Sequence, residues 1–177
     1  AARLEANSKY YDEARKLARI ASQIPRGEDG ERHFVVCSGG GPSIMEAANR
    51  GANDVGAESI GLNIVLPHEQ APNTYVTPSL SFQFHYFALR KMHFLLRARA
   101  VAVFPGGFGT FDETFELLTL IQTGKIKAMP VIMFGKEFWN RVINFDALVE
   151  EGVISPADIN LFTFVETAEE AWDVIRQ

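Results

Sequence analysis

Short apolar runs alternate with longer stretches of helical spacing along most of the chain. The apolar runs predict strands at 34–37, 60–66, 80–84, 101–104, 131–134 and 162–165. Apolar residues three and four positions apart predict helices over 7–24, 42–53, 86–99, 110–123, 136–150 and 167–176. This alternation predicts an α/β fold in which a mostly parallel central sheet lies between layers of helices.

Composition narrows the class of protein. The chain has 177 residues, of which 47% are hydrophobic, so we expect one compact domain over 1–177. The net charge of −5 argues against a general nucleic-acid binder. The single Cys37 excludes an internal disulfide and favours a reducing compartment, taken here as the cytoplasm, and we expect Cys37 in the core. No apolar run is long enough to predict a membrane span, and the lack of an initial Met predicts a missing N-terminal piece.

The stretch 105–113, Pro-Gly-Gly-Phe-Gly-Thr-Phe-Asp-Glu, lies between a predicted strand and a predicted helix. A glycine-rich turn at such a place leaves free backbone N–H groups at the positive end of the helix dipole, which favours an anion. No Lys follows the glycines as in a P-loop, and the spacing is not G-x-G-x-x-G. The stretch therefore predicts an anion site that matches neither of these common motifs.

Two interpretations of Glu113 stay open from the residues alone. On a helical wheel of 110–123 it falls on the apolar side, between Leu117 and Leu120, where a carboxylate shielded from water is suited to catalysis. Thr110, three positions earlier, also fits a capping box in which the Glu113 side chain accepts from the Thr110 N–H. The pattern favours catalysis and capping about equally.

A second turn from strand to helix, the stretch 38–42, reads Ser-Gly-Gly-Gly-Pro. Both glycine turns are expected at the carboxyl edge of the sheet, where open α/β folds bind ligands. Together they favour a crevice for a nucleotide or a sugar phosphate. In the helix that follows, Glu46, Asn49 and Arg50 are predicted on the polar side, with a surface ion pair between Glu46 and Arg50.

The predicted helix 86–99 is apolar over most of its circumference, so we expect it to be mostly buried. Its basic strip holds Arg90, His93 and Arg97. Solvation explains His93 and Arg97, whereas Arg90 stays open between solvent and an anionic ligand. Lys91 lies within the apolar arc, where it either extends its amine to water or faces the carboxylate of the second glycine stretch.

Metal and nucleophilic chemistry have weaker support. The four His residues show no metal-ligand spacing with one another or with acidic residues, so no metal site is predicted. Cys37 or Ser38 as a nucleophile would need a positioned base, and none lies nearby in the sequence.

The second glycine stretch and the basic helix together resemble a known family. Residues 105–113 fit P-G-G-x-G-T-x-x-E, and the pair Arg90-Lys91 begins fifteen residues before Pro105. Both features resemble the LONELY GUY (LOG) family of cytokinin-activating phosphoribohydrolases, many of which carry the label "possible lysine decarboxylase". The similarity covers most of the chain, from about Tyr10 to the C-terminus.

The first glycine turn shows one departure from this family. Residues 39–47 resemble the family's first glycine motif, but Ser43 stands where the family usually has Gly, so we expect an altered loop backbone. The family's first strand is also absent, and Ala2-Arg3 is interpreted as its remnant.

The resemblance implies a Rossmann-like nucleotide-binding domain that hydrolyses AMP or a cytokinin riboside 5′-monophosphate to free base and ribose 5-phosphate. It implies catalytic roles for Arg90 and Glu113, and so favours catalysis for Glu113. The substrate or phosphate is expected to bind Gly40, Gly41, Met45, Lys91, Gly106, Gly107, Gly109 and Thr110. No cofactor or metal is implied, and a homodimer or higher homo-oligomer is expected.

Two other functions remain as alternatives. A non-catalytic module would bind the nucleotide without releasing its base. A decarboxylase would hold pyridoxal phosphate at the glycine loops and use Lys91 as its Schiff-base lysine.

Overall fold

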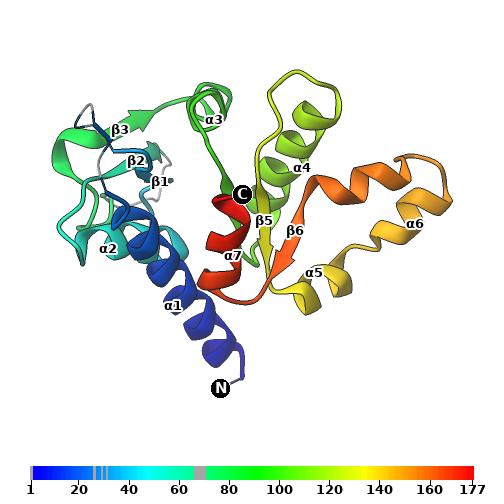
Figure 1. Ribbon diagram of the computed structural model, residues 1–177, viewed down its shortest axis with the longest axis horizontal. Coiled ribbons are helices and arrows are strands. Elements are labelled where there is room, and N and C mark those ends of the chain that lie inside the picture. The colour runs from blue at the N-terminus through cyan, green and yellow to red at the C-terminus, as the bar shows by residue number, and fades with distance from the viewer. Residues whose placement is uncertain (1, 26, 29, 31, 66–70) are drawn as a thin grey trace. The chain divides into compact units, whose positions relative to one another are not determined.

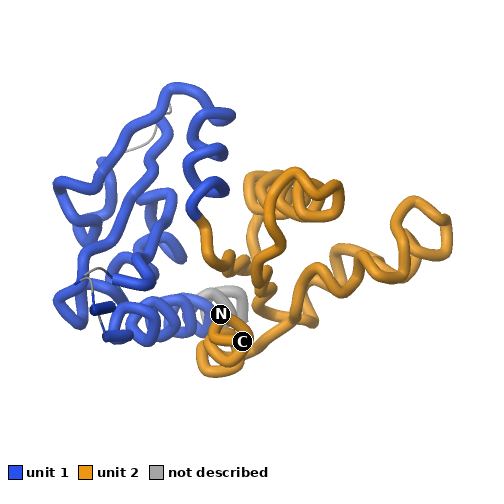
Figure 2. The backbone as a smooth tube through the Cα atoms, turned by 45° about the horizontal axis from the view of Figure 1, so that its top comes forward, with its two compact units in different colours: residues 1–97 blue, residues 98–177 orange. Residues whose placement is uncertain are grey.

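The computed structural model describes the chain except residues 1, 26, 29, 31 and 66–70, and it divides into two compact units (Figures 1 and 2). Unit 1 is Ala1–Arg97 and unit 2 is Ala98–Gln177. Each unit holds a parallel three-stranded sheet, so the predicted parallel α/β class is confirmed, with the described strands in two sheets. The expectation of one domain over 1–177 stays a prediction, and the part of the predicted 60–66 strand at residue 66 lies outside the described residues.

Unit 1 is built around the sheet order β1-β2-β3. Its elements are α1 (Ala2–Ser22), β1 (Val36–Ser38), α2 (Ile44–Asn53), β2 (Ser59–Ile64), the 3₁₀ helix η1 (Pro78–Leu80), β3 (Ser81–Phe84) and α3 (Phe87–Leu96). Cys37 pairs with Ile60 and Leu62 with Phe82. Helix α1 packs on α2, α2 contacts β1 and β2, and α3 contacts β2 and β3. This packing places the α2 N-terminus directly after the carboxyl end of β1.

Unit 2 repeats this arrangement with the order β4-β5-β6. Its elements are β4 (Val101–Val103), α4 (Phe108–Gln122), β5 (Val131–Phe134), α5 (Lys136–Val142), α6 (Phe145–Glu150), the 3₁₀ helix η2 (Pro156–Leu161), β6 (Thr163–Val165) and α7 (Ala168–Ile175). All four residues of the central strand β5 are buried. The fully buried Trp139 packs beside this strand and donates its indole N–H to the Phe134 carbonyl at 2.8 Å, which leaves no polar atom of the ring unpaired.

The predicted helix over 136–150 is wrong as a single element. Helix α5 ends at Val142, Ile143 is extended, and α6 begins at Phe145. Asn144 is the N-cap of α6, and its side chain accepts from the Ala147 N–H at 3.0 Å. This capping hydrogen bond stabilises the N-terminus of a second helix. The spacing of apolar residues alone does not indicate that break.

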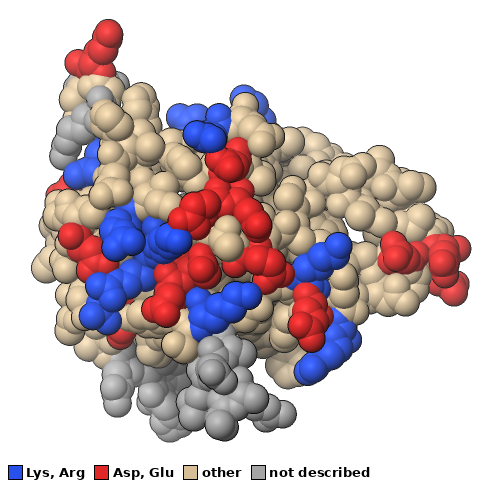
Figure 3. Space-filling model, turned by 60° about the horizontal axis from the view of Figure 1, so that its bottom comes forward, with Lys and Arg blue, Asp and Glu red and all other residues tan. Residues whose placement is uncertain are grey.

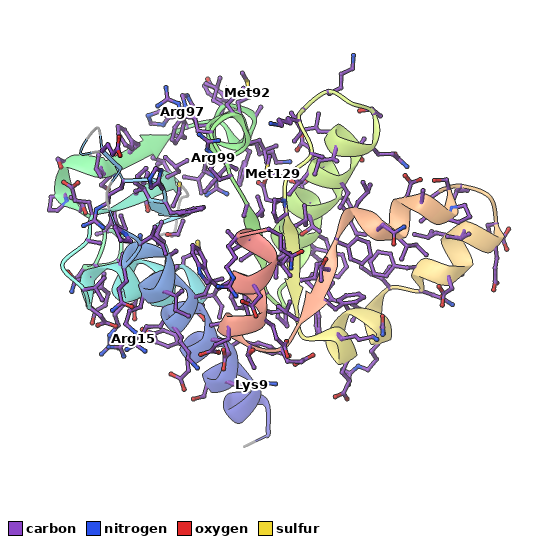
Figure 4. The ribbon with its side chains drawn as sticks, viewed as in Figure 1. Lys9, Arg15, Met92, Arg97, Arg99 and Met129 are labelled. Carbon is purple, nitrogen blue, oxygen red and sulfur yellow. The ribbon has the colours of Figure 1, made fainter. Side chains whose placement is uncertain are left out.

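The expectation that the 86–99 helix is mostly buried is also wrong. No residue of α3 is buried, and four of its large apolar side chains are half exposed or more: Phe87, Leu89, Met92 and Leu96. Met92 of α3 projects outward from the helix in Figure 4, as does Arg97, the residue after it. Within unit 1 the helix contacts β2 and β3, and these contacts leave none of its residues buried.

Cys37 is exposed, so its expected place in the core is wrong. It lies on β1, an edge strand of its sheet, and the buried residue of that strand is the next one, Ser38. No helix of the described residues is long and apolar enough to cross a membrane.

Charged side chains of opposite sign lie beside one another on the face drawn in Figure 3. One such pair joins α1 to the residue after α2: Arg15, labelled in Figure 4, donates to both carboxylate oxygens of Asp54, at 2.6 and 2.8 Å. These hydrogen bonds lower the pKa of Asp54 below its ordinary value. The ion pair therefore supports the packing of α1 on α2, although its partial exposure keeps its contribution small.

Candidate functional site

The first glycine loop follows β1 and leads into α2. Gly40 has φ +71°, a left-handed conformation that glycine adopts without strain. Its N–H donates to Ser38 Oγ at 2.9 Å, and its carbonyl accepts from the Asn73 N–H at 2.8 Å. The loop is therefore held by hydrogen bonds on both sides of Gly40.

Met45 and Arg90 lie against this loop. A Cβ on Gly39 would be 2.6 Å from Met45 Sδ, and one on Gly41 would be 2.6 Å from Met45 Cε. The same Gly39 position is 3.7 Å from Arg90 Nη1. Two glycines thus let Met45 and the Arg90 guanidinium approach the loop backbone closely.

Aromatic rings hold the Arg90 guanidinium in place. Its central carbon is 5.3 Å from the Phe87 ring centroid and 5.9 Å from the Phe94 ring centroid, within the range of cation–π attraction. Its Nε is buried and has no hydrogen-bond partner in the described part of the chain. Because an unpaired buried donor costs about 1–3 kcal/mol, this group is suited to an acceptor supplied by a ligand. Lys91, the next residue of α3, is half-buried.

Ser43 has a backbone conformation that favours glycine, the residue usual at this position in the family, and whether the loop differs from the family's stays a prediction. Ser43 is the N-cap of α2, with φ 62° and ψ −123°, a conformation that residues with a Cβ rarely adopt. Its side chain makes no capping hydrogen bond. The position therefore carries backbone strain, of a kind that costs about 1–3 kcal/mol, without the usual benefit of a Ser N-cap.

Replacing Ser43 by Gly is expected to raise the free energy of unfolding by about 1 kcal/mol, because the relief of strain exceeds the added chain entropy of Gly. The matched control is Ser43→Ala, which removes the hydroxyl and keeps the Cβ, so it should give no gain. Thermal unfolding of the three proteins measures the difference, expected as roughly 2–4 °C in Tm. Equal Tm values for the Gly and Ala variants would show that Ser43 is not strained.

The second glycine loop follows β4, and α4 begins at Phe108 with Gly107 as its N-cap. A Cβ on Gly107 or on Gly109 would meet no atom within 4 Å, and neither glycine has a positive φ. Neither the turn nor packing within the chain therefore requires glycine here. A Gly in a helix lowers stability by about 1 kcal/mol relative to Ala, so these glycines need another explanation. The missing side chains leave the first-turn N–H groups of α4 open to a ligand that approaches the backbone closely.

Thr110 packs inside this loop, because a Cβ on Gly106 would collide with its side-chain oxygen. Thr110 is the third residue of α4, and the helix has Gly107 as its N-cap, so Thr110 and Glu113 do not form a capping box. The capping interpretation of Glu113 is wrong for this reason.

Glu113 lies one turn into α4. Residues three and four apart are neighbours on a helix, so Glu113 is on the same side as Gly109 and Thr110. It is half-buried, and long side chains on a helix lean toward its N-terminus. This general preference favours a carboxylate that faces the first turn of α4.

The structure brings the predicted site residues together in two groups. Gly40, Gly41, Met45 and Arg90 gather at the first loop in unit 1. Gly106, Gly107, Gly109, Thr110 and Glu113 gather at the start of α4 in unit 2. In the described residues, no group of three or more His, Cys, Asp or Glu side chains could hold a metal ion.

Sequence reasoning misplaced one residue beside the first loop and missed another. Asn49 was expected on the polar side of its helix, but it is fully buried, with its side chain bonded to Ser38 and Ser59. Asn73, which bonds the loop at Gly40 and Gly41, lies between the predicted strands 60–66 and 80–84, where no periodic pattern marks it. For both residues the sequence shows only a polar side chain, and that alone does not indicate a hydrogen bond to the loop.

Glu46 and Arg50, the expected surface pair of α2, both contact a tyrosine of α1. The Tyr11 hydroxyl donates to Glu46 Oε1 at 2.9 Å and accepts from Arg50 Nη1 at 3.4 Å. Burial raises the pKa of the Tyr11 hydroxyl above its ordinary value, so it stays protonated as a donor. These residues support helix packing rather than the loop.

Known proteins match both the sequence and the fold. A family model described as "possible lysine decarboxylase" matches residues 45–175. The probable cytokinin riboside 5′-monophosphate phosphoribohydrolase LOGL3 of Oryza sativa subsp. japonica is 28% identical, over 95% of this chain and 76% of that protein. The cytokinin riboside 5′-monophosphate phosphoribohydrolase LOG3 of Arabidopsis thaliana is 29% identical, over 77% of this chain and 63% of that protein. The probable enzyme LOG4 of the same rice is 29% identical over 77% of this chain, which spans 59% of its length.

Among solved structures, the molybdenum cofactor carrier protein MCP from Chlamydomonas reinhardtii has the same fold. It superposes with a TM-score of 0.64 at 17% identity, over 96% of this chain and 88% of that chain. At this identity the likeness shows the fold alone, and it agrees with the expected Rossmann-like class. The family model covers more than half of the chain, including Met45, Arg90 and the whole second glycine loop. The chain therefore belongs to the "possible lysine decarboxylase" family, the LONELY GUY family that its glycine motifs resemble.

Proposed function

We propose that the protein hydrolyses the N-glycosidic bond of a nucleoside 5′-monophosphate and releases the free base and ribose 5-phosphate. The observation that carries this proposal is the start of α4, where Gly107 and Gly109 leave the backbone open and Glu113 lies one turn behind them. The open amides suit the 5′-phosphate, and the carboxylate suits the reacting carbon of the ribose. The proposed substrates are cytokinin riboside 5′-monophosphates, which the plant relatives' names give, and AMP, which has the same 5′-phosphate and ribose.

Glu113 supplies the chemistry in this proposal. Departure of the base leaves positive charge on the ribose ring, which a nearby carboxylate stabilises. The carboxylate also accepts a proton from the attacking water, whose oxygen bonds to C1′ while the base leaves with the glycosidic electron pair. The base takes up a proton from solvent and the Glu113 carboxyl returns its proton to solvent, so that one water is consumed in total. Contacts to the phosphate hold the ribose in place for this attack, so binding energy far from the bond lowers the barrier.

Arg90 supplies the second charged contact. Its guanidinium is held by Phe87 and Phe94, and its buried Nε has no partner in the described part of the chain, so a ligand acceptor would satisfy it. The phosphate or the leaving base is the proposed acceptor. A planar guanidinium can donate two parallel hydrogen bonds to either group.

A non-catalytic binding module is the second candidate. The open backbone at Gly107 and Gly109 and the Arg90 Nε, unpaired within the described residues, would bind a nucleotide whether or not its base is released, so the same contacts suit this candidate. A decarboxylase with pyridoxal phosphate on Lys91 is the third, and the family description favours it. Absorbance of a Schiff base after mixing with pyridoxal phosphate would support the decarboxylase.

Product analysis tests the proposed function. The protein is incubated with a panel of nucleoside 5′-monophosphates that includes AMP and N6-substituted adenosine 5′-monophosphates, and the products are separated by chromatography. Free base and ribose 5-phosphate in equal amounts are expected from at least one of them. Tight binding with intact nucleotide recovered would contradict hydrolysis and support the binding module.

Replacing Arg90 by Ala is expected to lower kcat/KM by about 100-fold, because two charge-assisted hydrogen bonds are lost. Arg90→Lys keeps the charge without the planar fork, so it should recover less than a tenth of the lost rate. Steady-state base release measures both variants. Arg97→Lys, an exposed change at the residue that follows the same helix, is the control and should leave the rate unaltered. Nearly full activity in Arg90→Lys would instead indicate a simple electrostatic role.

A further inference from the structure

A network of buried amide and hydroxyl groups lies beneath the first glycine loop. Asn49, which is fully buried, forms its centre and uses all of its side-chain hydrogen-bonding capacity. Its Oδ1 accepts from Ser38 Oγ at 2.7 Å and from Asn73 Nδ2 at 3.0 Å. Its Nδ2 donates to Ser59 Oγ at 3.0 Å and to the Ile60 carbonyl at 3.3 Å. The network thus joins β1, β2 and the segment that holds Asn73.

Asn73 connects this network to the loop. Its Nδ2 donates to the Gly41 carbonyl at 3.0 Å as well as to Asn49, and its backbone N–H donates to the Gly40 carbonyl. Its Oδ1 accepts from the Tyr75 N–H at 3.1 Å, which fixes the orientation of the amide. One residue therefore holds two consecutive carbonyl groups of the loop.

The planarity of the peptide bond turns these contacts into a direction for the loop donors. In a trans peptide the carbonyl of one residue and the N–H of the next point to opposite sides. Since the Gly40 carbonyl points toward the Asn73 N–H, the Gly41 N–H points away from Asn73. The Gly40 N–H is already bonded to Ser38, and Pro42 has no N–H. The Gly41 N–H is therefore the donor that residues 40–42 present on the side opposite Asn73.

We propose that Asn73 is a positioning residue that aims the Gly41 N–H at the bound nucleotide. It touches no substrate and acts through the loop, and the inference rests on the proposed function because it names a determinant of binding for the proposed nucleotide. Asn49 holds Asn73 in turn. Asn49 is fully buried, so loss of its hydrogen bond to Asn73 would leave a buried amide oxygen with one partner fewer, which is costly. Loss of the Asn73 side chain lets the Gly41 peptide rotate and weakens nucleotide binding.

Two variants test this role. Asn73→Ala removes the side-chain donor, and Asn73→Asp replaces Nδ2 by an oxygen that faces two acceptors, the Gly41 carbonyl and Asn49 Oδ1. For both, we expect the Kd for AMP, measured by calorimetry, and the KM to rise roughly tenfold, with kcat changed less than about threefold. A tenfold change is about 1.4 kcal/mol, the scale of one hydrogen bond to a charged group.

The matched control removes a neighbouring hydrogen bond that does not reach the loop. Thr77 Oγ1 accepts from the Ser59 N–H at 2.9 Å, so Thr77→Val perturbs the same region of unit 1. It should lower Tm as Asn73→Ala does and leave the Kd and KM unaltered. The exposed Asn140→Asp controls for the added charge of Asn73→Asp.

Unchanged Kd and KM in both Asn73 variants, with only a lower Tm, would overturn the positioning role. The same rise in Kd for Thr77→Val would overturn it too, because the effect would then be general destabilisation. If the natural chain binds AMP but releases no base, the proposed function fails while the Kd values still decide the role of Asn73. If the natural chain does not bind AMP, both proposals fail.

Discussion

Glu113→Gln is expected to lower kcat for base release by at least about 100-fold while the Kd for AMP changes less than about threefold. The two side chains have the same shape, so contacts to a bound nucleotide are kept. Gln carries no negative charge to stabilise the ribose cation and accepts no proton from water, and a positioned acid–base group contributes about 10²–10⁴-fold. The half-buried position of Glu113 on the Gly109 side of α4 is the structural reason for this expectation.

Single-turnover base release and calorimetric AMP binding measure the two effects separately. Glu116→Gln is the control, because it makes the same change at an exposed position one turn farther along α4. Normal turnover in Glu113→Gln would assign Glu113 a structural role. That role would need a contact other than a capping box, since α4 has Gly107 as its N-cap.

The sequence predicted the strands and most helices well, because buried parallel strands and amphipathic helices leave strong periodic signals. The run 131–134 coincides with β5, whose residues are all buried. The pattern also located both glycine turns between a strand and a helix, since composition and position both mark them.

Capping could not be predicted from spacing alone. Thr-x-x-Glu occurs at 110–113 and again at 167–170, and only the second forms a capping box. There, Thr167 accepts from the Glu170 N–H and the Glu170 carboxylate accepts from the Thr167 N–H. The stretch 110–113 forms no capping box because α4 begins at Phe108, two residues before Thr110, with Gly107 as its N-cap. The deciding feature is where the helix starts, which the pattern does not specify.

Burial depends on neighbours that are distant in sequence, and this explains the other errors. Asn49 can be buried because four polar groups from β1, β2 and the 73–75 segment satisfy its side chain, and none of them is visible on a helical wheel. No residue of α3 is buried, although the helix contacts β2 and β3 of unit 1. Periodicity reports which residues could be buried, and tertiary contacts decide which are.

The second large effect concerns the 5′-phosphate of the substrate. The open first turn of α4 presents backbone N–H groups at the positive end of a helix dipole, which favours a phosphate group. Without the phosphate these contacts are lost and the ribose is held loosely beside Glu113. Loss of two or more contacts at ~1.5–3 kcal/mol each predicts a kcat/KM for adenosine about 1000-fold below that for AMP.

Gly107→Ala and Gly109→Ala link this requirement to the loop. An added Cβ has open space within the chain, so both variants should fold, and Gly109→Ala should be stabilised by roughly 1 kcal/mol. The methyl groups would obstruct a phosphate at the backbone, so AMP hydrolysis should fall while the slow adenosine reaction is little affected.

Adenine release from AMP and from adenosine, under identical conditions with the natural chain, tests the central claim most directly. The account predicts that AMP reacts about three orders of magnitude faster in kcat/KM. Comparable values for the two substrates would contradict it, because the glycine loops would then not bind phosphate productively.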